Sequence, residues 1–172
     1  LTFPPGVMTR TLLVAILGDS LDEPNEIFRV LLSNAVGAVV ADAEGIGTIR
    51  DNEPPPNDHF ANRIALSGTN ATATGSNIDA TKEADEPDHA GNAGGRSVWW
   101  TWTAPTSGFV QITTAGSDFN STLAVYTGDS LAGLALVAAG GDSANNQACQ
   151  VGFQAVAGVV HQIAVDGWDG AQ

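Results

Sequence analysis

Acidic side chains gather in two short stretches near the start of the chain. A polar loop over residues 18–26 contains four of them, and residues 51–53 form a second acidic group. The four in the loop are Asp19, Asp22, Glu23 and Glu26. Clustered carboxylates repel one another unless a cation lies among them, and calcium takes six to eight hard oxygen ligands of this kind. The pattern therefore leaves two interpretations, a calcium site and a solvated acidic loop.

The tetrapeptide Gly-Asp-Ser-Leu occurs twice, at residues 18–21 and 128–131. It resembles the nucleophile motif of one esterase superfamily. That chemistry needs the serine at a strand-to-helix turn and a base from a downstream Asp-x-x-His, which occurs nowhere in the sequence. We therefore predict that both copies are turns of a β protein, with no catalytic residues and no enzyme activity in this chain.

The histidines and tryptophans give weaker signals. His59, His89 and His161 are too scattered for a zinc site, and His161 alternates with apolar residues as at the rim of a buried face. Tryptophans 100 and 102 alternate with Trp99, which predicts a strand with one buried face. Trp99 and Trp168 are then the candidate surface aromatics for a ligand such as a sugar.

A third acidic cluster lies in a long polar stretch, residues 67–95. It can hold calcium, contact a partner or be a solvated loop, and the sequence leaves these alternatives open. Its members are Glu83, Asp85, Glu86, Asp88 and His89.

Composition sets the class of protein that must position these residues. Of 172 residues, 43% are hydrophobic, only 15% are charged and 20 are glycine, which favours an all-β fold. The net charge of −13 disfavours nucleic acid and anionic membrane surfaces as partners. The apolar runs are shorter than the ~20 residues that cross a bilayer, so we expect no membrane span. Cys149 is the single cysteine, which excludes an internal disulfide and predicts a small buried hydrophobe.

Runs of β-branched and apolar residues predict the strands. Four are expected before the linker, at residues 11–17, 27–33, 36–41 and 45–50. Six more are expected after it, at residues 98–103, 109–115, 121–127, 134–139, 149–156 and 159–166. Three successive prolines at residues 54–56 impose an extended backbone and mark a domain boundary.

Residues 1–53 resemble the C-terminal half of a Calx-beta module. The resemblance lies in LTFPPG at residues 1–6, GDSLDEPNEIF at 18–28 and GIGTIRDN at 45–52. It implies an antiparallel, Ig-like sandwich whose N-terminal strands are missing from this chain. It also implies a calcium site between the acidic loop and the stretch after the last strand, incomplete and weak in this fragment. The implied ligands are Asp19, Glu23, Glu26, Asp51, Asn52 and Glu53.

After a proline linker at 54–58, residues 59–172 resemble the pre-peptidase C-terminal-like domains of secreted bacterial peptidases. The motif that begins at the linker is NDHFAN, and SVWWTWTAP, LAVYTG and IAVDG follow it. The resemblance implies a jelly-roll-like β-sandwich that lacks its final strand here.

Together the two resemblances predict non-catalytic, calcium-binding or adhesive modules of a large exported bacterial protein, extracellular or at the cell surface. Such modules act in spacing, surface attachment or secretion, with calcium, matrix, glycan or neighbouring modules as partners. The alternatives are a carbohydrate- or matrix-binding module and the non-catalytic tail of a secreted peptidase or other hydrolase.

Overall fold

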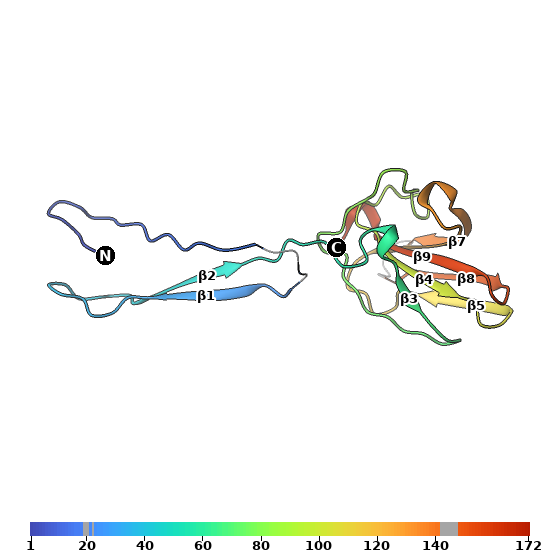
Figure 1. Ribbon diagram of the computed structural model, residues 1–172, viewed down its shortest axis with the longest axis horizontal. Coiled ribbons are helices and arrows are strands. Elements are labelled where there is room, and N and C mark those ends of the chain that lie inside the picture. The colour runs from blue at the N-terminus through green and yellow to red at the C-terminus, as the bar shows by residue number, and fades with distance from the viewer. Residues whose placement is uncertain (19–20, 22, 142–147) are drawn as a thin grey trace. The chain divides into compact units, whose positions relative to one another are not determined.

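The computed structural model describes residues 1–18, 21, 23–141 and 148–172 of an all-β chain (Figure 1). It divides into two units, Leu1–Asp51 and Asn52–Gln172. The first domain was predicted to extend to residue 53, slightly beyond the end of the first unit. In the described part, the helices are short 3-10 turns, and none has the length or hydropathy to span a membrane.

The first unit contains one antiparallel hairpin. Strand β1 (Glu26–Leu31) pairs with β2 (Glu44–Ile49), and Phe28 lies opposite Gly47. The Phe28 ring crosses over Gly47 so closely that a Cβ at this glycine would lie 2.2 Å from the ring. None of the described residues of this unit is buried, so the hairpin encloses no core.

Two of the four strands predicted in the first unit are wrong. Residues 11–17 and 36–41 form no strand, although both are apolar. Leu13, Val36 and Val39 are 89%, 96% and 94% exposed. An apolar, β-branched sequence becomes a strand only when a neighbour accepts its backbone hydrogen bonds, and neither segment pairs with a strand among the described residues.

The second unit is a two-layer arrangement of strands. A five-stranded sheet has the order β3-β4-β9-β6-β7, and β5 pairs with β8 in a second sheet. All pairs are antiparallel except β3 with β4. The strands are β3 (Ile64–Leu66), β4 (Val98–Thr103), β5 (Gly108–Thr113), β6 (Ser121–Thr127), β7 (Ala135–Gly141), β8 (Gln150–Ala155) and β9 (Val160–Gly167). The 3-10 turns are η1 (Phe60–Asn62), η2 (Leu131–Gly133) and η3 (Trp168–Gly170).

The core lies between these two sheets. Trp100, Trp102 and Ile163 from the larger sheet form one buried cluster with Val151 and Phe153 from β8. The predicted inward orientation of the two tryptophans is confirmed, because residues two apart on a strand share a face. Cys149 is buried in the same cluster, as expected.

The opposite face of the five-stranded sheet is also buried. Trp99, Ala124, Tyr126 and Ala164 form a second apolar cluster there with Phe60 of η1. This face has no second sheet over it in the described part of the chain, and the long loop between β3 and β4 contributes the buried His89 beside Trp99. Central strands of this sheet are therefore buried on both sides, and all but the last residue of β6 is buried.

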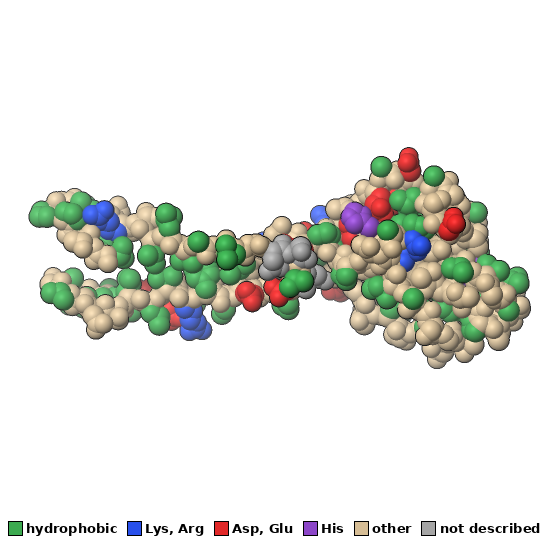
Figure 2. Space-filling view, in the orientation of Figure 1, with side chains coloured by type: hydrophobic (Ala, Val, Ile, Leu, Met, Phe, Trp, Pro, Cys, Tyr) green, Lys and Arg blue, Asp and Glu red, His purple; other side chains and the backbone are tan. Residues whose placement is uncertain are grey.

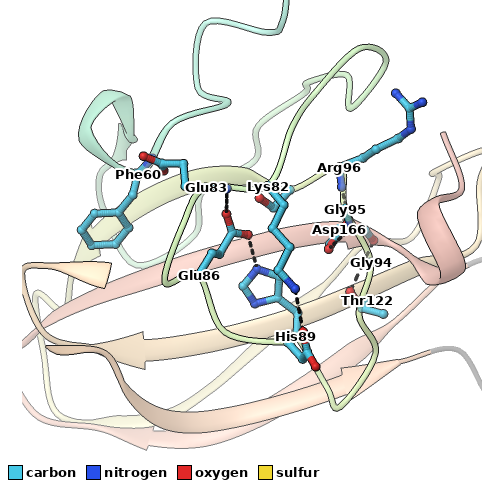
Figure 3. A network of polar contacts seen from close by, with 12 residues as sticks. Phe60, Lys82, Glu83, Glu86, His89, Gly94, Gly95, Arg96, Thr122 and Asp166 are labelled. Carbon is cyan, nitrogen blue, oxygen red and sulfur yellow. Dashed lines mark hydrogen bonds and ion pairs between the residues drawn. The ribbon is translucent and has the colours of Figure 1, made fainter. Parts of the chain in front are cut away.

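The Asp166 carboxylate fixes the end of this loop to the sheet (Figure 3). Asp166 is fully buried and accepts hydrogen bonds from the backbone N–H groups of Gly95, Arg96 and Gly167. Gly94 passes so close that a Cβ there would lie 1.7 Å from the Asp166 carboxylate, and its φ of +51° is left-handed. A side chain at residue 94 cannot be accommodated without moving the carboxylate from its donors.

We therefore expect Gly94→Ala to destabilise the second unit by at least about 3 kcal/mol, since backbone strain adds to the loss of the Asp166 hydrogen bonds. Gly91→Ala is the matched control, because Gly91 also has a positive φ, +74°, but nothing lies within 4 Å of its Cβ position. It should cost only about 1–2 kcal/mol. Urea unfolding followed by tryptophan fluorescence measures both, since all four tryptophans lie in this unit. Equal losses would contradict the role given to Asp166.

Candidate functional site

Three predicted calcium ligands of the first unit are described, and they lie near the start of β1 and the end of β2: Glu23, Glu26 and Asp51. The backbone N–H of Glu23 donates to Asp51 Oδ1 at 3.1 Å, and the Asp51 N–H donates to Asn25 Oδ1 at 2.9 Å. Glu26 is the first residue of β1 and pairs with Ile49. The end of the acidic loop therefore contacts Asp51, two residues after β2.

These contacts do not assemble a metal site by themselves. Among the described residues, no group of three His, Cys, Asp or Glu side chains is placed to hold a metal ion. Asp19 lies outside the described residues, and Asn52 and Glu53 belong to the second unit. The Asn52 N–H donates to Glu53 Oε2 at 3.1 Å. Asn25, which the sequence analysis did not select, contributes a side-chain oxygen at this end through its hydrogen bond to Asp51.

The acidic cluster of the long loop is an internal network of hydrogen bonds (Figure 3). His89 is fully buried, with its Nδ1 2.8 Å from the Tyr126 hydroxyl and its Nε2 2.9 Å from Glu86 Oε1. The other Glu86 oxygen accepts the Glu83 N–H at 2.9 Å. Glu83 in turn accepts the Phe60 N–H at 2.5 Å. This chain of contacts joins the loop to strand β6 and to η1.

The solvated-loop interpretation is wrong for Glu86 and His89, which are buried, and for Glu83, which is half-buried and bonded to Phe60. Asp85 and Asp88 are exposed. Lys82 Nζ binds Asp88 at 2.6 Å and the Ala93 carbonyl at 2.8 Å, and the Lys82 contact lowers the pKa of Asp88. The Tyr126 hydroxyl lies against the buried His89. Burial is the main cause, and the nearby carboxylates a smaller one, that raises the pKa of Tyr126 to about 12. Tyr126 therefore stays protonated, and its neutral phenol group hydrogen-bonds to His89 Nδ1.

Of the two predicted surface aromatics, one is misplaced. Trp99 is 0% exposed and packs edge-on against Phe60 and His89, so the expectation that it contacts a ligand at the surface is wrong. Alternation correctly placed Trp99 on the face opposite Trp100, but that face is covered as well. Trp168 in η3 is partly exposed and lies against Gly141, so it keeps an accessible edge.

The second Gly-Asp-Ser-Leu copy runs from the end of β6 into η2, with a bend at Asp129 and Ser130 and with Leu131 as the first residue of η2. Gly128 has a φ of +118° and Ser130 precedes η2 with extended backbone angles. The first copy lies partly outside the described residues.

His161 is buried in the core between the sheets. It is 3% exposed, stacks on Trp102 and packs against Phe153. Neither ring nitrogen has a hydrogen-bond partner among the described residues. Burial lowers the pKa of His161, because the charged imidazolium is unfavourable in this apolar setting.

A cavity of about 810 Å³ opens between the sheets beside β5. Its floor is apolar and includes Trp100, Trp102 and Ile163, and Val110 and Ile112 of β5 form one wall. Residues 68–77, which follow β3, line the other wall. Asp118 is the single charged residue among the described ones that line it. Its volume lies within the range of ligand pockets, and no local sequence pattern predicts it because its walls come from distant segments.

Comparisons with protein-family models, with curated proteins and with solved structures find no match for this chain.

Removing the Tyr126 hydroxyl tests the loop network. We expect Tyr126→Phe to destabilise the second unit by about 1–3 kcal/mol, because it leaves a fully buried imidazole nitrogen without a partner. In a His89→Phe background the same change should cost close to nothing. A double-mutant cycle in urea gives the coupling between the two side chains. Additive losses would show that the contact contributes nothing.

We expect the second unit to become less stable as the pH is lowered, because His161 is buried as a neutral imidazole. Its folded pKa lies below the ordinary 6.5, so its contribution to stability is complete above pH 6.5 and is lost as the pH falls further. His161→Leu should flatten urea-unfolding stability between about pH 7 and pH 5. An unchanged slope in His161→Leu would refute the assignment.

Proposed function

We propose that this chain is a non-catalytic pair of β modules from an exported, surface-associated protein. The observation that carries the proposal is the burial of the polar side chains of the second unit that could act as acids, bases or metal ligands. Glu86, His89 and Asp166 are buried and bonded to the loop and sheet that they join. The cavity beside β5 has Trp100, Trp102 and Ile163 in its lining and none of these three residues. Among the described residues, these three buried side chains are separate from the cavity, which favours a role in binding or spacing.

We also propose that the first unit belongs to a Calx-beta-type module and that the second is a jelly-roll-like, pre-peptidase C-terminal-like domain. The hairpin without a core, in a unit that contains the acidic loop, supports the first assignment. The two-sheet core with Trp100 and Trp102 facing inward supports the second.

Calcium is the proposed ligand of the first unit. The Glu23–Asp51 contact brings two predicted ligands to one end of the unit. One Asp51 oxygen is already an acceptor for Glu23 N–H, so the other oxygen and the Glu23 carboxylate are the groups that would bind the ion. Calcium needs six to eight oxygens, and sites on extracellular modules bind at about 10⁻⁴–10⁻³ M. We therefore propose a weak site at this end of the first unit.

Calorimetric titration of the chain with calcium should give a dissociation constant of about 1 mM, with NMR shift changes at the Glu23 and Asp51 amides. Glu23→Gln should weaken binding by about tenfold, because it removes a charged ligand. Glu44→Gln is the matched control, since Glu44 begins β2 and pairs with Arg29 at 2.8 Å. No heat and no shift change at millimolar calcium, or equal effects of the two variants, would rule out this site.

A further inference from the structure

The outer edge of strand β5 is unpaired. In the described residues its sheet has two strands, and β5 pairs there with β8 alone. The Thr114 N–H donates to the Cys149 carbonyl at 2.9 Å, which fixes the alternation of the antiparallel ladder. The backbone N–H and C=O groups of Phe109, Gln111 and Thr113 therefore point away from β8. No hydrogen bond of the described chain uses these groups.

This edge has none of the features that usually block strand addition. Proteins protect exposed edges with charged side chains, proline or a bulge. The β5 sequence GFVQIT contains no charge and no proline, and its register with β8 is regular. The edge is therefore a ready template for another strand.

The cavity lies directly beside this edge. Val110 and Ile112, which alternate with the outward-pointing backbone groups, face it from β5, and residues 68–77 face them from across the opening. We call this space the β5 groove. A strand laid along β5 would span about 20 Å over six residues and direct every second side chain onto the tryptophan floor.

Trp100 adds an unused hydrogen-bond donor. Its side chain lines the groove and is 8% exposed, and its Nε1 has no partner among the described residues. The neighbouring Trp102 Nε1 donates to the Gly68 carbonyl at 2.9 Å. A buried indole N–H normally finds an acceptor, and a peptide carbonyl entering the groove can provide one.

We propose that the β5 groove binds an extended peptide strand from another protein. The strand pairs with Phe109, Gln111 and Thr113 and inserts apolar side chains at alternate positions, and basic flanking residues favour it because the chain has a net charge of −13. A small apolar ligand fills the cavity but leaves the edge unpaired, so a strand accounts for both features. This binding rests on the proposed binding role of the second unit, and it needs no calcium.

The test uses chain 1–172 in EDTA and the peptide Lys-Thr-Val-Thr-Val-Thr-Val-Thr-Lys, with blocked ends. The matched control Lys-Thr-Thr-Val-Val-Val-Thr-Thr-Lys has the same composition and charge without the alternation. We expect the alternating peptide to bind about tenfold more tightly in calorimetry. Amide hydrogen exchange should slow by about tenfold or more at Phe109, Gln111 and Thr113, and change little at Val110 and Ile112.

Gln111→Pro removes one outward N–H and no N–H that is bonded to β8, so it should weaken binding by about tenfold while Gln111→Thr does not. If Gln111→Pro fails to fold, the exchange pattern of the unmodified chain decides. Equal binding of the two peptides, or no protection at the three amides, would overturn the proposal. Protection of those amides without peptide, with dimers in light scattering, would assign the groove to a second copy and overturn it as well. Because EDTA is present, either failure leaves the calcium proposal untouched.

Discussion

Burial of both faces of the five-stranded sheet is the constraint on which the second unit depends. One face is covered by β5 and β8, and the other by η1 and the loop from β3 to β4 (Figure 1). A loop cannot bury backbone polar groups without partners, so it needs polar anchors inside the protein. Asp166 and Glu86 provide acceptors for loop N–H groups, and His89 joins the loop to Tyr126. Glu86 and His89, which the sequence offers as members of a possible calcium site, instead anchor the loop over an apolar interface.

Much of this second unit could be predicted from the sequence. Period-two alternation placed Trp100 and Trp102 in the core, and glycine and proline punctuation gave the six strands predicted after the linker to within a few residues. Alternation says that Trp99 lies on the other face, but not what covers that face. The burial of His89 depends on Tyr126, 37 residues away, and no local pattern contains that contact. The groove beside β5 was missed for the same reason.

The first unit gave the opposite result. Its local sequence favours more strands than it forms, because strand propensity describes how a residue fits a sheet and cannot supply the neighbouring strand. Hydrophobic side chains consequently remain at the surface of this unit, as Figure 2 shows. No local pattern predicts the contact of Glu23 with Asp51, since 28 residues separate them.

Lys82 is the only lysine in the chain, and it is engaged with Asp88 and the Ala93 carbonyl. Both contacts lie within the loop that covers the sheet. Amine-directed chemistry, such as surface immobilisation or cross-linking, has Lys82 and the terminal amine as its targets. Acylation of Lys82 converts its ammonium group to a neutral amide and breaks both contacts. A reagent used only to immobilise the protein would therefore remove two contacts of the loop that covers its five-stranded sheet.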